Sequence, residues 1–147
     1  MVVTFCGHRD FQESVERRQA LLDYLEKRVG DNSAELLLGI YGNFDSFAYA
    51  CCKEYKKQHA NVRLIACVPY LDEHKISELS DKFDSIIYPE IENKPRKFAI
   101  FYCNRYMVNR SGLLIAYVTR TWGGAYATYK FAKGQGKEIF NLSQSTF

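Results

Sequence analysis

Short apolar runs alternate along the chain with longer segments whose apolar residues recur at helical spacing. The runs are rich in β-branched residues, and several are apolar throughout rather than alternating with polar residues. Such a run is typical of a strand buried on both faces, as in a parallel sheet covered by helices. The predicted strands are Val2–Cys6, Leu36–Ile40, Val62–Val68, Ser85–Tyr88, Leu113–Val118 and Glu138–Leu142.

The segments between these runs predict helices. In the first segment, four apolar residues fall on one helical face: Val15, Leu22, Leu25 and Val29. Asp10 followed by Glu13 resembles a capping box, and Gly30 is placed to end the helix. The other helices are predicted from about Asp45 to His59, over a short stretch after Asp72, from Arg96 to Asn109 behind Pro95, and from Ala125 to Lys133 ahead of Gly134 and Gly136.

This regular alternation of strands and helices indicates βαβ units with right-handed crossovers. We therefore expect an α/β, three-layer, Rossmann-like domain. Its sheet should be mainly parallel, with about six strands, helices on both faces and Val2–Cys6 near the centre. No repeat, linker or low-complexity tract divides residues 1–147, so a single domain is expected.

Composition and charge limit the functional classes. The net charge is +3 and the Lys and Arg residues are spread along the chain, which is too weak a pattern for a nucleic-acid footprint. No apolar stretch is long enough for a membrane span, and no secretory signal follows Met1, so we expect a cytoplasmic protein. Aromatic residues make up 15% of the chain, which favours packing and leaves a homodimer interface or base stacking open.

The cysteines predict neither disulfides nor a metal site. The chain has five of them, an odd number, and none forms a C-x-x-C pair. Cys6 and His8 lie close together, but two neighbouring ligands without a second pair are weak evidence for a metal or for a nucleophile. We expect five reduced thiols.

Four loops follow predicted strands at the edge of the sheet where ligands bind in parallel α/β folds. They are Gly7–Arg9, Tyr41–Asp45, Pro69–Tyr70 and Thr119–Gly124. Three of them place glycine just ahead of a helix, where the backbone and the free helical N–H groups can approach a phosphate. The P-loop, dinucleotide-binding, nucleophile-elbow and zinc-protease motifs are all missing from the sequence.

Four segments, in order along nearly the whole chain, resemble the motifs of one family. They are Thr4–Arg9, Gly42–Asp45 with Ala48, Asn104–Val108 with Ser111, and Gly123–Thr128 with Ala132. They are similar to the G-H-R, G-x-x-D-x-x-A, R-N/N-R-x-M-V and G-G-T-x-x-T-x-x-A motifs of YpsA/YoqJ-like proteins. That family belongs to the SLOG superfamily, the SMF/DprA and LOG group of Rossmann-like domains.

The resemblance implies a site that binds or senses a nucleotide or a nucleotide-derived, ADP-ribose-like ligand. The expected site residues are Gly7, His8, Arg9, Gly42, Asp45, Arg105, Trp122, Gly123, Gly124 and Ala125. Backbone N–H groups of the last three would hold phosphate, and Arg9 would add a bidentate charge contact. For the other side chains a structural role stays open beside the functional one. Asp45 would bind a ribose or cap a helix, and Arg105 would enter the cleft or face solvent. His8 would donate to phosphate or pack in a turn. Trp122 and Tyr41 would flank a base or pack.

One departure from the group bears on catalysis. Members of the LOG branch cleave ribose phosphate from a base and have the motif P-G-G-x-G-T-x-x-E at the turn that corresponds to Gly123–Thr128. This chain has Trp122 in place of the proline of that motif and Lys130-Phe131 where its glutamate is expected. Without that carboxylate no general acid/base is evident, and no catalytic residue is assigned. A phosphoribohydrolase that uses Asp10, Asp45 or Glu90 is the first alternative. Single-stranded nucleic-acid binding, as in the DprA branch, is the second, and the weak net charge counts against it.

Overall fold

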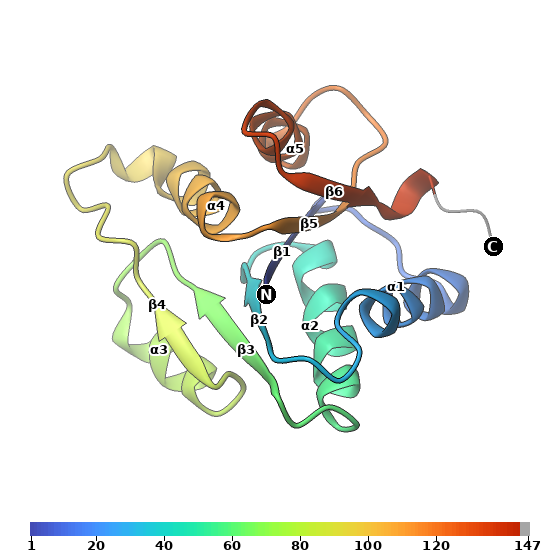
Figure 1. The fold of residues 1–147 in the computed structure, drawn as a ribbon. Coiled ribbons are helices and arrows are strands. Elements are labelled where there is room, and N and C mark those ends of the chain that lie inside the picture. The colour runs from blue at the N-terminus through green and yellow to red at the C-terminus, as the bar shows by residue number, and fades with distance from the viewer. Residues whose placement is uncertain (145–147) are drawn as a thin grey trace.

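The computed structural model describes residues 1–144. Within them, six strands form one parallel sheet in the order β4-β3-β2-β1-β5-β6. The strands are β1 (Val2–Gly7), β2 (Ala34–Leu38), β3 (Val62–Cys67), β4 (Ser85–Ile87), β5 (Leu113–Tyr117) and β6 (Glu138–Asn141). The predicted parallel sheet with its first strand near the centre is confirmed, and Figure 1 shows β1 between β2 and β5.

Helices cover both faces of the sheet, as the sequence predicted (Figure 1). The helices α1 (Val15–Arg28), α2 (Asn43–Lys56) and α3 (Glu73–Ser80) lie on one face, and α4 (Ala99–Arg110) and α5 (Gly124–Gly134) lie on the other. Two short 3₁₀ helices, η1 (Arg96–Phe98) and η2 (Leu142–Gln144), precede α4 and follow β6. No helix in residues 1–144 has the length and apolar character needed to cross a membrane.

The alternation of side chains along the strands divides the core between these two faces. Val3 and Phe5 of β1 pack into the large cluster beneath α1 and α2. Cys6, pointing the other way, packs with Ala132 of α5. Thr4, the polar residue of this central strand, is buried, and its hydroxyl donates to the Leu37 carbonyl at 3.0 Å. Both faces of β1 are therefore buried, which explains its almost continuous apolar sequence.

The start of α1 differs from the prediction. Its N-cap is Ser14, whose Oγ accepts from the Arg17 N–H at 3.1 Å, and the proposed capping box at Asp10 is wrong. The preceding residues form a turn that places Phe11 in the core, 4% exposed, and leaves Asp10 paired with Arg120. Val15 accordingly lies outside the apolar face of α1 and is 80% exposed.

The turn from β2 into α2 is also shifted from the prediction. The strand ends at Leu38 and the helix begins at Asn43, two residues earlier in each case than expected. The reason is Asp45, whose carboxylate accepts from the Tyr41 N–H at 2.9 Å and lies against Gly39. The chain from residue 39 to residue 42 wraps around this carboxylate and cannot continue the strand ladder.

The end of β1 depends on the absence of a side chain at Gly7. A Cβ atom built there would overlap the ring of Phe44, which is 1% exposed in the core. We predict that Gly7→Ala lowers the free energy of unfolding by about 1–3 kcal/mol, because the ring must move out of a packed core. Urea titration measures this, with Gly124→Ala as the control because nothing lies within 4 Å of its Cβ position. A Gly7→Ala variant as stable as the wild type would contradict the packing role.

Candidate functional site

The order of the strands reverses beside β1. From β1 the chain order runs through β2, β3 and β4 toward one edge of the sheet, and through β5 and β6 toward the other. The loops that follow β1 and β5 therefore diverge, because the next helices, α1 and α5, cover opposite faces. In open α/β sheets such a reversal opens a crevice at the carboxyl ends of the strands, where ligands bind.

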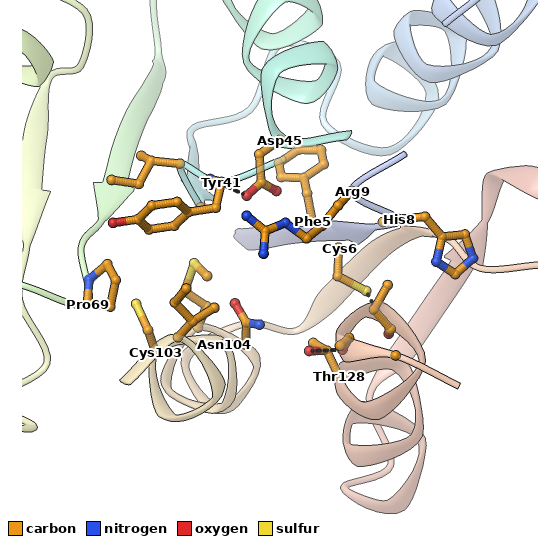
Figure 2. A pocket seen from close by; sticks show the side chains of 18 of the residues that line it. Phe5, Cys6, His8, Arg9, Tyr41, Asp45, Pro69, Cys103, Asn104 and Thr128 are labelled. Atoms are coloured by element: carbon orange, nitrogen blue, oxygen red, sulfur yellow. Dashed lines mark hydrogen bonds between the residues drawn. The ribbon is translucent and has the colours of Figure 1, made fainter. Parts of the chain in front are cut away.

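A pocket of about 380 Å³ occupies this position. Its walls come from the loops after β1, β2, β3 and β5 and from the facing sides of α4 and α5. Figure 2 shows Asp45, Tyr41 and Arg9 along one side and Cys103 and Asn104 of α4 opposite them. The volume lies within the range of about 300–1,000 Å³ found for small-molecule sites.

Eight of the ten expected site residues line this pocket. They are Gly7, His8, Arg9, Asp45, Trp122, Gly123, Gly124 and Ala125. Gly42 lies just behind the lining, where its Cβ position is 3.1 Å from the Arg9 Cα atom. Arg105 lies farther along α4, and its guanidinium sits 4.4 Å from the ring centres of both Phe101 and Phe131. The structure thus brings the predicted loops together around one pocket, and the sequence could not tell which side of α4 faces it.

The N-terminus of α5 is open toward the pocket. Its N-cap is Gly123, with a φ of +91°, and no side chain caps the helix. The backbone N–H of Ala127 donates to the Gly123 carbonyl at 3.1 Å, so the N–H groups of the three residues before Ala127 have no carbonyl within the helix. Free amides and the positive end of the helix dipole favour an anion here.

Arg120, to which the sequence assigned no role, reaches the same end of the pocket. Its Nη1 atom donates to Asp10 at 3.1 Å, and its guanidinium lies 4.1 Å from the centre of the Trp122 ring. The Nε atom is buried and has no hydrogen-bond partner in residues 1–144. A buried donor without a partner costs about 1–3 kcal/mol, so this nitrogen favours an acceptor group in the pocket. No motif marks this arginine, so the sequence carried no signal for it.

His8 joins the two diverging loops. It is 4% exposed, and its Nε2 atom accepts from the Thr119 N–H at 3.0 Å. Burial, and then the charge of Arg120, lower the pKa of His8, so the imidazole is neutral when Nε2 accepts this bond. Nε2 is therefore engaged and not free to donate to a phosphate, which favours the structural role that the sequence left open.

Asp45 lies at the opposite end of the pocket. It belongs to the first turn of α2, and its carboxylate caps the N–H of Tyr41 rather than that of a helical residue. Burial raises the pKa of this carboxyl from its ordinary 3.8 to about 6, against smaller lowering effects of the Tyr41 N–H and the Arg9 charge. Figure 2 shows the Arg9 side chain extending toward Asp45 and Tyr41. A carboxylate held this way accepts further hydrogen bonds from a ligand hydroxyl.

The five cysteines are buried and free in the structure. Cys6 and His8 do not form a nucleophilic pair, since the Cys6 thiol lies 3.7 Å from the Ala125 carbonyl and His8 accepts from Thr119. Burial raises the pKa of the Cys6 thiol far above its usual value, which leaves it unreactive. Cys67 and Cys103 line the pocket with their sulfur atoms 2.8 Å apart. No group of three or more metal-ligating side chains occurs in residues 1–144.

Asp45 should make the stability of the fold depend on pH. With its pKa raised to about 6, the folded state binds a proton more tightly than the unfolded chain. The stability that comes from the protonated carboxyl is therefore lost as the pH rises from about 4 to about 7. We predict that Asp45→Asn is more stable than the wild type at about pH 7.5, by up to about 3 kcal/mol, and that this gap shrinks toward about pH 4.5. Urea unfolding at both pH values measures it, and a gap independent of pH would contradict the shift.

Comparison with known proteins identifies a similar fold. No family model matches this sequence, and neither does any curated protein. The X-ray structure of DNA processing protein A (DprA) from Streptococcus pneumoniae is similar, with a TM-score of 0.67 and 15% sequence identity over 95% of this chain and 49% of that chain. The present chain thus spans about half the length of that protein. Membership of the YpsA/YoqJ-like subgroup stays a prediction. The chain has a Rossmann-like fold, and the matched half of DprA has a similar fold.

Proposed function

We propose that this pocket binds a nucleotide or a nucleotide-derived ligand, with its phosphate at the N-terminus of α5. The observation that carries the proposal is the buried Nε atom of Arg120, a donor without a partner beside an uncapped helix end. A buried donor without a partner is unfavourable, and the free N–H groups of the helix end are available to an anion. Both are satisfied by the same thing, an anionic group with several acceptor oxygens.

The phosphate donors come from one loop and one helix. The backbone N–H groups of Gly124 and Ala125 belong to α5, and Arg120 belongs to the β5 loop, whereas Arg9 on the β1 loop extends toward Asp45 at the other end. One arginine and two amides suit a phosphate, because charge-assisted hydrogen bonds to phosphate are stronger than neutral ones. The absence of a side chain at Gly124 leaves room for close approach, since nothing lies within 4 Å of its Cβ position.

The other end of the pocket suits the nucleoside part of the ligand. The Asp45 carboxylate is placed to accept from ribose hydroxyls, and it lies close enough to Arg9 to feel the arginine charge. Tyr41 lines the same side of the pocket, and Trp122 lines the β5 side, where it is 65% exposed. Either ring offers a face on which a base can stack.

A thermal-shift panel identifies the ligand. The panel holds AMP, ADP, ATP, ADP-ribose and inorganic phosphate. A ligand that binds only the folded state stabilises it by RT ln(1 + [L]/Kd) and so raises the Tm. We expect at least one nucleotide to raise the Tm at a concentration at which inorganic phosphate does not. Calorimetry with that nucleotide then supplies the affinity for the variants below.

Gly124→Val should abolish binding and leave the protein folded. The added side chain enters open space in the protein but occupies the approach of the phosphate to the helix amides. Gly134→Val is the matched control, because it places the same side chain at the other end of α5, where nothing lies within 4 Å of the Cβ position either. If Gly124→Val is folded and binds the nucleotide as tightly as the wild type, the phosphate does not bind at the N-terminus of α5.

Arg120→Ala tests the unpartnered donor itself. We predict a loss of about 1.5–3 kcal/mol in binding free energy, the range for a hydrogen bond to a charged group. The free energy of unfolding should change far less, because the substitution also removes a buried donor that lacks a partner. Calorimetry and urea unfolding on the same sample separate the two effects. A large loss of stability with unchanged affinity would assign Arg120 to the fold.

An N-glycoside hydrolase of the phosphoribohydrolase type is a second candidate, favoured by one observation. Asp45 is a pocket carboxyl with a pKa of about 6, a value that suits general acid/base catalysis near neutral pH. Of the other carboxylates considered, Asp10 pairs with Arg120 and Glu90 lies outside the pocket lining. Release of free base from the bound nucleotide, absent in Asp45→Asn, would favour catalysis over binding alone.

A further inference from the structure

Two cysteines that lie far apart in the sequence meet in the wall of the pocket. Cys67 is the last residue of β3, and Cys103 lies within α4, 36 positions later in the chain. Their sulfur atoms are 2.8 Å apart, and both residues line the pocket. The sequence has no C-x-x-C pair and gave no sign that these two are partners, because only the packing of α4 on the sheet brings them together.

The surroundings of the pair are apolar. Leu37 of β2, Ile65 of β3 and Met107 of α4 form one buried cluster with the two cysteines. Each sulfur has the other as its hydrogen-bond partner. The contact between the two thiols is therefore part of the packed interface between α4 and the sheet, and it is held in place from both sides.

The pair is nevertheless open to small molecules through the pocket. Cys67 and Cys103 are only 2% and 3% exposed, but both belong to the lining of a cavity of about 380 Å³, which is far larger than a molecule such as hydrogen peroxide. Figure 2 shows Cys103 on the side of the pocket where Pro69 lies. Cys51 and Cys52 differ in this respect, because they are 0% exposed in the core beneath α2 and are not part of the pocket lining.

The distance between the sulfurs distinguishes two kinds of chemistry that a pair of thiols can perform. Two thiolates that share one tetrahedral metal ion, each at about 2.3 Å from it, lie about 3.8 Å apart. A disulfide needs a separation of about 2.0 Å. At 2.8 Å the sulfurs of Cys67 and Cys103 are too close to share an ion, and an approach of about 0.8 Å brings them to bonding distance. The geometry therefore favours oxidation over metal binding.

We propose that Cys67 and Cys103 are a site of reversible oxidation, at which a peroxide that enters the pocket converts the two thiols into a disulfide between β3 and α4. In the first step the Cys67 thiolate attacks one oxygen of hydrogen peroxide, the O–O bond breaks, and Cys67 becomes a sulfenic acid while hydroxide leaves. In the second step the Cys103 sulfur attacks the Cys67 sulfur, the S–O bond breaks, and the hydroxyl group leaves as water with the proton of the Cys103 thiol. The hydroxide takes up the proton that Cys67 lost, so two thiols are oxidised and one peroxide is reduced to two water molecules.

The hydrogen bond between the sulfurs assigns the two roles. The bond to Cys67, and then burial, raise the pKa of the Cys103 thiol well above its usual value. Cys103 therefore keeps its proton and donates it to the bond, which leaves Cys67 as the sulfur that attacks the oxidant, since the thiolate is the nucleophilic form. This inference concerns the chemistry of the pocket wall and does not rest on the nucleotide-binding proposal.

The disulfide would fix one wall of the pocket. Three further residues of α4 line the cavity, namely Ile100, Asn104 and Met107. In the dithiol form α4 is held to β3 through packing in the apolar cluster, and the disulfide adds a covalent link at the same place. The oxidised protein should therefore have a less mobile α4 than the reduced protein.

The test treats the folded, reduced protein with hydrogen peroxide and follows the thiols. The count of free thiols, measured after unfolding, should fall from five to three and return to five with dithiothreitol. Trypsin places each partner in a peptide with a single cysteine, residues 64–75 for Cys67 and residues 98–105 for Cys103, so that mass spectrometry identifies the linked pair directly. We expect this pair to form at least about tenfold faster than any loss of the other three thiols, which lack a partner sulfur facing the pocket.

Three comparisons separate the pair from general thiol oxidation. Cys67→Ala and Cys103→Ala should each abolish the linked peptides. Cys6→Ala is the matched control, because Cys6 also lines the pocket but lies outside the pair, and this variant should form the linked peptides at the rate of the wild type. Circular dichroism checks that each variant is folded. In urea the wild type should give mixed pairings, since the approach of the two sulfurs depends on the fold.

Amide hydrogen exchange tests the effect on the pocket wall. Exchange in α4 should slow in the oxidised wild type and stay unchanged in peroxide-treated Cys103→Ala. Equal exchange in the oxidised and reduced wild type would contradict the fixing of α4.

Three results would overturn the oxidation site itself. The first is a count of five thiols in the folded protein after a peroxide treatment that oxidises the protein in urea. The second is a linked pair in the folded protein that joins other cysteines. The third is loss of the thiols of Cys67 and Cys103 that dithiothreitol does not restore, which would indicate irreversible oxidation rather than a disulfide.

Discussion

The parallel pairing of β1 with β5 is the constraint on which the site depends. The two strands run side by side from Val3 opposite Leu113 to Gly7 opposite Tyr117, and the chain then leaves them toward opposite faces of the sheet. The hydrogen bond from the Thr119 N–H to His8 Nε2 links the two loops where they separate. The loop that brings Arg9 into the pocket and the loop that brings Arg120 are therefore placed by one strand pair and one imidazole.

The pocket collects groups that do not favour the folded state by themselves. At one end are an uncapped helix and a buried guanidinium nitrogen without a partner, and at the other is a carboxyl whose burial opposes its ionisation. The rest of the core is apolar and well satisfied, as the buried hydroxyl of Thr4 illustrates. Such a concentration of unfavourable polar groups in a cavity is typical of a functional site, because a ligand can supply what the protein leaves unpaired.

Much of the fold could be predicted from the sequence because a strand buried on both faces is apolar throughout, and β1 has that property. The glycine loops could also be predicted, since glycine ahead of a helix is a local feature. The N-cap of α1 could not, because Asp10 and Ser14 are both good caps, and the pairing of Asp10 with the distant Arg120 is a tertiary contact that the local sequence does not reveal. Arg105 was placed in the site for a similar reason. Helical spacing fixes its relation to Asn104 on α4 but not which of the two faces the pocket.

The segregation of charge between the helical layers has a consequence for how partners approach. Residues 1–92 contain 16 acidic and 11 basic residues, whereas residues 93–137, which include α4 and α5, contain nine basic and no acidic residues, so the side of α4 and α5 is the more positive one. A field of this kind acts over about a Debye length, about 8 Å at physiological ionic strength, before any contact forms. An approaching anion is therefore attracted to the side of α4 and α5 before it contacts the protein.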